Sequence, residues 1–193
     1  YSYTDKKSGY WYGRTHQTST EWWSGWNMAK KRILSDYTLG TDGTALDRTK
    51  AACVVYPERL VRTWDNAEET FLLIDDMPIL YIGLETKADS IFCRLAMDHI
   101  AKTETAAEGM MFVPKESPDK YILLAPAADV PHSIIEDGIC APAKAGGFVL
   151  TFGSKDECTE LLNSFRTQGK ELMKARKERI DALITEYNPV RTN

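Results

Sequence analysis

Residues 70–82 read TFLLIDDMPILYI and decide the fold class. Two β-prone apolar runs, 70–74 and 79–82, are separated by the polar break Asp75-Asp76-Met77-Pro78. Two such runs joined by a short break that contains proline are typical of a β-hairpin. The stretch therefore predicts antiparallel strand pairing near the middle of the chain.

Further strand-like runs lie on both sides of this hairpin. Together with it they give about seven short strands: 51–56, 70–74, 79–82, 90–96, 109–113, 121–124 and 148–152. The segments between them are too short for repeated helical crossovers, which argues against a doubly wound α/β fold. Segment 38–50 is predicted to be a loop, and 97–108 a short helix or a loop. The fold class expected for residues 51–153 is an antiparallel β-sandwich or a small barrel.

The C-terminal segment 154–188 predicts one long amphipathic helix, so the whole chain is α+β. Ser154 and Glu157 form a capping box, in which each side chain satisfies the other's backbone N–H. An apolar stripe at helical spacing follows, although Gly169 interrupts it. About 34 residues at 1.5 Å each exceed the width of so small a domain, so the helix is expected to pack on the sheet and extend beyond it. Candidate partner-binding residues on the second half are Ile180, Leu183, Ile184 and Tyr187.

The first 50 residues form an aromatic-rich N-terminal arm in this prediction. A short helix is expected from Thr20 to Asp36, because Thr20 suits an N-cap and the apolar residues that follow approximate a helical stripe. Internal packing, a partner interface and a glycan-stacking platform all fit the aromatic residues. The candidate ligand or partner residues are Tyr10, Trp11, Tyr12, Trp22, Trp23 and Trp26.

Charge and composition exclude several classes of protein. The net charge of −4 divides into about +3 for residues 1–50, −8 for 51–150 and +1 for 151–193. An acidic central region repels phosphate, so no nucleic acid is expected as a partner. No apolar run reaches the roughly 18 residues of a transmembrane helix. No glycine-rich phosphate loop is present, and no cofactor is predicted.

The cysteines leave two alternatives open for the cellular compartment. The four residues are Cys53, Cys93, Cys140 and Cys158. Their even number and wide spacing fit two disulfides of an exported protein, or equally four buried thiols of a cytoplasmic one. The start at Tyr1 without a methionine is typical of a chain whose signal peptide has been removed, and also of a trimmed one. The prediction is a secreted or periplasmic location, with the cytoplasm as the alternative.

No catalytic or metal signature stands out. His16, His99 and His132 have no partner at metal-ligand spacing. The acidic residues around Asp75 lack EF-hand spacing. Cys140 and His132 could form a nucleophile and base only if folding brought them together. The sequence therefore predicts no catalytic residue and no metal site.

The predicted function follows from these features. The chain is expected to be a non-enzymatic structural or interaction component of a larger assembly, which binds a protein partner or a second copy of itself through its termini. The first alternative is a carbohydrate or small-ligand binding module that uses the N-terminal Trp and Tyr residues. The second alternative is a hydrolase with an unrecognised site.

Overall fold

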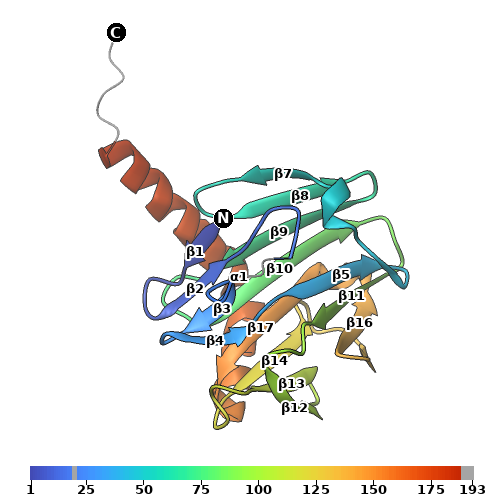
Figure 1. The fold of residues 1–193 in the computed structure, drawn as a ribbon. Helices are drawn as coiled ribbons and strands as arrows, with labels where there is room; N and C mark the ends of the chain where they lie inside the picture. Colours follow the sequence, from blue (N-terminus) through green and yellow to red (C-terminus); the bar gives the residue numbers. More distant parts are fainter. Residues whose placement is uncertain (19–20, 188–193) are drawn as a thin grey trace.

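The molecule consists of three antiparallel β-sheets and one long C-terminal helix (Figure 1). The computed structural model describes residues 1–18 and 21–187. The expected antiparallel, mostly β architecture with a terminal helix is confirmed. The described ranges contain 17 strands, and eleven of them, β7 to β17, lie in residues 51–153, where about seven were expected. None of the sheets in these ranges closes on itself, and the barrel alternative is wrong.

The largest sheet has eight strands and forms the middle layer. Across the sheet they are β12 (Ile100–Thr105), β13 (Met110–Pro114), β14 (Tyr121–Pro126), β17 (Gly147–Gly153), β10 (Ile79–Thr86), β9 (Ala67–Leu73), β8 (Leu60–Trp64) and β7 (Ala52–Val55). Six of the seven predicted strands lie here, and the hairpin of residues 70–82 is the β9–β10 pair, with Leu73 opposite Leu80. Two strands of this sheet were missed: β8, and β12 within the segment expected to be a helix or loop.

Both faces of this sheet are covered, which explains why residues 71–74 are apolar without interruption. Phe71 and Leu73 belong to one core cluster, while Leu72 and Ile74 belong to a second cluster on the opposite face. Successive side chains of a strand point to opposite faces, so a strand buried on both sides needs apolar residues at every position.

Two smaller sheets cover the inner face. One has five strands in the order β15 (Ser133–Ile135), β16 (Gly138–Pro142), β11 (Ser90–Leu95), β5 (Tyr37–Thr41) and β6 (Thr44–Ala45). The other has four strands in the order β1 (Ser2–Thr4), β2 (Gly9–Tyr12), β3 (Gly25–Met28) and β4 (Lys31–Leu34). Two 3₁₀ turns, η1 (Arg48–Lys50) and η2 (Ala143–Ala145), connect strands. The loop expected at 38–50 therefore contains most of β5, all of β6 and η1.

The predicted helix from Thr20 to Asp36 is wrong. Residues 25–34 form the β3–β4 hairpin, in which Ala29 and Lys30 both have positive φ angles of 49° and 67°. Two consecutive left-handed residues are typical of a type I′ turn, whose twist matches that of the flanking strands. Trp26 pairs with Trp11 across the sheet, and both rings are buried. Tertiary burial of these rings therefore overrides the helical spacing of the apolar residues.

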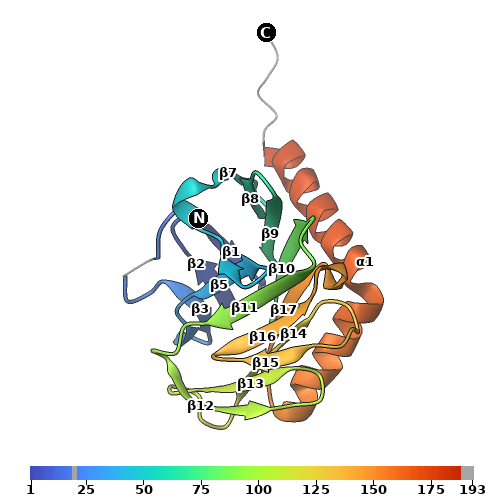
Figure 2. The ribbon, with the colours of Figure 1, turned by 90° about the vertical axis from the view of Figure 1, so that its right-hand side faces the viewer.

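The C-terminal helix α1 (Lys155–Tyr187) covers the outer face (Figure 2). The predicted capping box is present: Glu157 accepts a hydrogen bond from Ser154 N at 2.6 Å, and Glu157 N donates to Ser154 Oγ at 3.3 Å. Cys158, Leu162 and Phe165 then pack against the sheet. The helix continues through Gly169 without a break. At 33 residues it is about 50 Å long, and its last turns extend past the sheets (Figures 1 and 2).

Candidate functional site

The structure divides the aromatic residues of the first 26 positions into a buried and a surface group. Trp11 and Trp26 are buried in the core shared by all three sheets. Trp11 lies 5.0 Å from Phe71 of β9 and 5.6 Å from Tyr37 of β5, measured between ring centroids. These two tryptophans therefore join the N-terminal sheet to the rest of the molecule.

The surface group consists of Tyr10, Tyr12, Trp22 and Trp23. Trp22 is 79% exposed and Trp23 is 40% exposed, and their rings meet edge to face at 5.3 Å. Tyr12 packs against Trp23 at 6.4 Å, and Tyr10 is half-buried. This group presents apolar rings to solvent beside the polar loop of residues 13–17.

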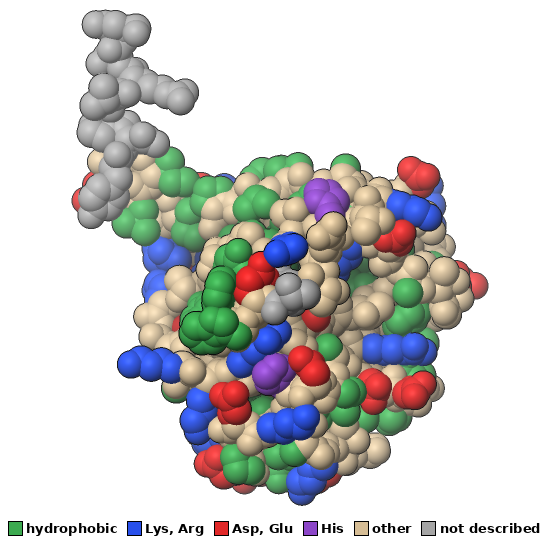
Figure 3. Space-filling model, in the orientation of Figure 1, with side chains coloured by type: hydrophobic (Ala, Val, Ile, Leu, Met, Phe, Trp, Pro, Cys, Tyr) green, Lys and Arg blue, Asp and Glu red, His purple; other side chains and the backbone are tan. Residues whose placement is uncertain are grey.

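A second exposed apolar surface lies at the distal end of α1. Ile180 is half-buried, while Leu183 and Ile184 are 40% and 41% exposed. Tyr187 ends the helix, and its side chain lies outside the described part of the structure. Figure 3 shows hydrophobic side chains on this protruding end and along the neighbouring rim of the molecule. Strand β7, the terminal strand of the large sheet, also exposes apolar side chains, at Val54, Val55 and Tyr56.

An ionic clamp fixes the helix where it leaves the sheet. Asp75, in the β9–β10 turn, is paired with both Arg176 and Arg179, the latter at 2.5 Å. Arg176 also donates hydrogen bonds to the backbone oxygens of Glu58 and Thr4, each at 3.1 Å. Burial lowers the pKa of Arg176, and the opposing effect of Asp75 does not fully restore it. The direction of the distal turns is therefore set by contacts with three separate parts of the chain.

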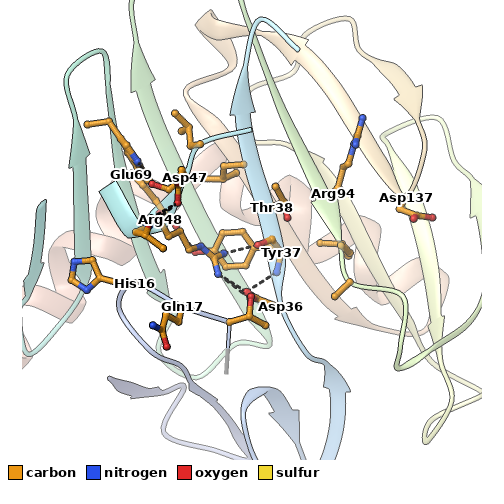
Figure 4. A pocket seen from close by; sticks show the side chains of 17 residues that line it. His16, Gln17, Asp36, Tyr37, Thr38, Asp47, Arg48, Glu69, Arg94 and Asp137 are labelled. Atoms are coloured by element: carbon orange, nitrogen blue, oxygen red, sulfur yellow. Dashed lines mark hydrogen bonds and ion pairs between the residues drawn. The ribbon is translucent and has the colours of Figure 1, made fainter. Parts of the chain in front are cut away.

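A polar cleft lies between the start of β5 and strands β8 and β9. Its volume is about 640 Å³. Its lining includes His16 and Gln17 from the N-terminal loop, Asp36 to Leu39, Asp47 to Thr49, Trp64, Glu69, Arg94 and Asp137. Figure 4 shows that Asp36, Tyr37 and Arg48 meet at its centre, while Arg94 and Asp137 lie to one side.

Two ion pairs organise the cleft. Arg48 donates to both carboxylate oxygens of Asp36, at 2.8 and 3.0 Å, and its guanidinium lies 4.5 Å above the Tyr37 ring. Behind this pair, Arg62 is fully buried and donates to Glu69 at 2.8 Å. Glu69 also accepts a hydrogen bond from the Tyr37 hydroxyl.

Burial and partners shift the pKa values in this network. For both arginines burial alone lowers the pKa. The Glu69 carboxylate reverses this for Arg62, and Tyr37 and Asp36 reverse it for Arg48, so both pKa values are raised. Burial, followed by Glu69, raises the pKa of Tyr37 well above its usual value. The arginines are therefore charged and the Tyr37 hydroxyl is neutral at neutral pH.

None of these cleft residues was predicted. Arg62 follows buried Leu60 at the inward-facing spacing of two, and Glu69 precedes buried Phe71 in the same way. The sequence did contain a signal for these two residues: each charged side chain occupies a strand position that points to the buried face, where a charge requires a partner. Asp36 and Arg48 lie on a segment expected to be a helix end and a loop, and gave no such signal.

All four cysteines are free thiols in the structure, so the expected disulfides are not present. Cys93 and Cys158 belong to core clusters on opposite faces of the large sheet. Cys140 is opposite Phe92 in the β11–β16 pair, so its side chain points away from the face that Cys93 occupies. Cys53 lies at the edge of the sheet on β7.

The remaining candidates from the sequence are the pair Cys140 and His132 and clusters of metal ligands. No hydrogen bond in these ranges joins His132 to Cys140, and the strand register places Ser133 opposite Cys140. Across residues 1–18 and 21–187 no three His, Cys, Asp or Glu side chains gather as metal ligands. Of the helices described, none has the length and apolar character that a membrane crossing requires.

Comparisons with known proteins do not identify a family for this chain. No protein-family model matches the sequence, and no curated protein matches it either. Among solved structures, one match is a crystal structure of the active YidC insertase with its first transmembrane domain resolved. The match has a TM-score of 0.43 and 12% identity, and it covers 79% of this chain and 37% of that chain. At this level of similarity the chain is not assigned to a family.

Proposed function

We propose that this chain is a non-enzymatic interaction domain that binds a protein partner through the distal end of α1. The observation that carries the proposal is an apolar stripe that continues after the helix has left the sheet. Positions 176, 180, 183 and 184 share one helix face. At the first of them, Arg176 is held by Asp75, while Leu183 and Ile184 remain exposed.

Energetics favour a partner for these turns. A helix without tertiary packing is marginal in water, and burial of one Leu or Ile side chain is worth about 1.5–3 kcal/mol. The ion pairs of Asp75 fix the direction of the helix before a partner arrives, which lowers the entropy lost on binding. A rigid, projecting helix with exposed apolar residues therefore fits a docking element.

The surface aromatic group is the second proposed contact element. Trp and Tyr are enriched in the centres of protein interfaces, and the exposed Trp22–Trp23 pair offers rings with little other packing. We place this assembly outside the cytoplasm on the composition of the N-terminal region alone. The free thiols lend no support to that location.

Purification of the tagged protein from the cells that express it tests the proposal. The wild-type chain is expected to elute with a partner in fixed stoichiometry, or as a defined oligomer by light scattering. The double variant Leu183→Asp/Ile184→Asp is expected to elute as a monomer. The control Thr185→Asp changes the neighbouring position of the exposed last turns and is expected to keep the complex.

Two results contradict the proposal. One is a wild-type chain that is strictly monomeric in this purification. The other is a complex that survives the double variant unchanged. Circular dichroism of each variant confirms that the fold is retained, because positions 183 to 185 lie beyond the sheets.

A further inference from the structure

The polar cleft has the size and position of a small-molecule site. Its volume of about 640 Å³ falls within the range of 300–1,000 Å³ typical of such sites. Four parts of the chain surround it: the N-terminal loop, the start of β5 with η1, the paired strands β8 and β9, and the end of β11 with Asp137 (Figure 4). It is separate from the distal end of α1, so this inference does not depend on the proposed protein partner.

The charges of the cleft favour a neutral occupant. The most deeply buried charges are paired, Asp36 with Arg48 and Glu69 with Arg62. An anionic ligand would meet the carboxylates of Asp36, Asp47 and Asp137. A cationic ligand would meet the guanidinium groups of Arg48 and Arg94. The buried charges are thus paired, and the remaining charges of the lining are of both signs, Asp47 and Asp137 against Arg94.

The cleft combines an aromatic wall with planar polar groups. Trp64 lines it as a half-buried residue packed against the core, and its indole N–H donates to the backbone oxygen of Asp47 at 2.8 Å, which fixes the position of the ring. Gln17, Thr38 and the outer edges of the Asp36–Arg48 pair supply hydrogen-bond donors and acceptors. A pyranose ring presents C–H groups on one face and hydroxyls around its edge, which matches both kinds of surface.

An unpartnered donor belongs to a residue that lines a small cavity beside the ion pair. The Nε1–H of Trp11 has no hydrogen-bond partner among the described residues, although the side chain is only 2% exposed. It lines a small cavity that shares Gln17, Asp36 and Arg48 with the cleft. A buried donor of this kind usually has an acceptor, and the cavity volume of about 10 Å³ has room for one water that bridges the N–H to a ligand in the cleft.

We propose that the polar cleft binds a neutral saccharide, with Trp64 as the stacking wall and Asp36, Arg48 and Gln17 as the hydrogen-bonding side. The carbohydrate alternative thus moves from the exposed aromatic residues to a cleft that the sequence did not reveal. None of the residues expected to stack on a glycan lines this cleft, and Trp11 lies in the small cavity beside it.

NMR titration of the isotope-labelled chain tests this site. The probes are glucose, galactose, xylose, N-acetylglucosamine, maltose and cellobiose, with arginine and citrate as charged comparisons. At least one sugar is expected to bind and to shift the indole N–H resonance of Trp64 and the amide of Thr38. Trp64→Ala and Gln17→Ala are each expected to weaken that binding at least tenfold, while Trp64→Phe keeps most of it. Gln17 is exposed, so its variant tests the site even if Trp64→Ala fails to fold.

Trp22→Ala is the matched control, because it removes an exposed indole outside the cleft and is expected to change the affinity less than twofold. Three results overturn the proposal. They are a panel in which no sugar shifts any cleft resonance, tighter binding of arginine or citrate than of every sugar, and loss of sugar binding in Trp22→Ala but not in Trp64→Ala.

Discussion

At the residue scale, the most unusual feature is a fully buried ion pair in the inner face of the large sheet. Arg62 and Glu69 are 0% and 1% exposed and sit opposite each other on β8 and β9. Removing two charges from water is costly, and their mutual attraction offsets this only when hydrogen bonds satisfy the remaining atoms. Arg62 meets that condition through the backbone oxygen of Thr15, and Glu69 through the Tyr37 hydroxyl.

Breaking this pair is expected to be more damaging than replacing it. Arg62→Met leaves the Glu69 carboxylate buried without its partner and should cost about 3–5 kcal/mol of unfolding free energy. The double variant Arg62→Met/Glu69→Leu should recover a large part of that loss. Urea unfolding of the single and double variants measures both values. A loss below about 1 kcal/mol in the single variant would mean that the pair is not buried in solution.

The thiols give a second test at this scale. Burial raises the pKa of Cys93 and of Cys158, so both are expected to stay protonated and unreactive in the folded chain. Alkylation by iodoacetamide at pH 8, followed by mass spectrometry, should label Cys93 and Cys158 only after denaturation. Cys140, which is half-exposed, serves as the comparison and should be labelled in the native chain. Fewer than four labelled sites after denaturation without reductant would reveal a disulfide and contradict the structure.

At the scale of elements, prediction from sequence succeeded where one signal dominated. The seven apolar runs all became strands, and the capping box marked the start of α1 correctly. The sequence misled in the first 36 residues, because few aliphatic residues alternate there and the spacing of the tryptophans resembled a helix. The left-handed turn at Ala29 and Lys30 contains no glycine or asparagine, the residues that usually indicate such a turn in a sequence. The cleft could not be predicted, since Asp36, Arg48 and Glu69 meet only through tertiary packing.

The capping box predicts a pH dependence. Hydrogen bonds from Ser154, followed by Lys120, lower the pKa of Glu157 in the folded chain. A glutamate in the unfolded chain has a pKa of about 4.3. The stabilising effect of Glu157 is therefore fully present above that pH and is lost as the pH falls through the lower folded value. Urea midpoints measured from pH 6 to pH 3 should fall more steeply for the wild type than for Glu157→Gln, whose amide does not titrate.

Glu160→Gln, on the same exposed stretch of the helix, is the control. Parallel curves for the wild type and Glu157→Gln would contradict the capping role.

At the scale of the whole molecule, the N-terminal sheet belongs to the common core. Tyr3, Trp11, Trp26, Ile33 and Leu34 share one cluster with residues of the other two sheets. The division at residue 50, drawn from the change in composition, marks a change of residue types within one packed body. The aromatic residues at the start of the chain therefore fall into two groups: some fill the core and others remain on the surface.

Removal of this sheet is expected to unfold the rest. Each large apolar side chain contributes about 1.5–3 kcal/mol through burial, and total stabilities are only about 5–15 kcal/mol. A chain that begins at residue 35 should lack dispersed amide resonances and cooperative thermal unfolding. A folded, cooperative fragment would show instead that the chain from residue 35 onward folds without the N-terminal sheet.

Photo-crosslinking at the distal end of α1 tests the central claim most directly. A benzoylphenylalanine placed at position 184 faces the same way as Leu183 and Arg176, whereas one at position 185 lies on the neighbouring face. In the cells that express the protein, irradiation is expected to give one discrete crosslinked product from position 184 and little or none from position 185. Equal yields from both positions, or no product from position 184, would contradict the proposal that this stripe is where the partner binds.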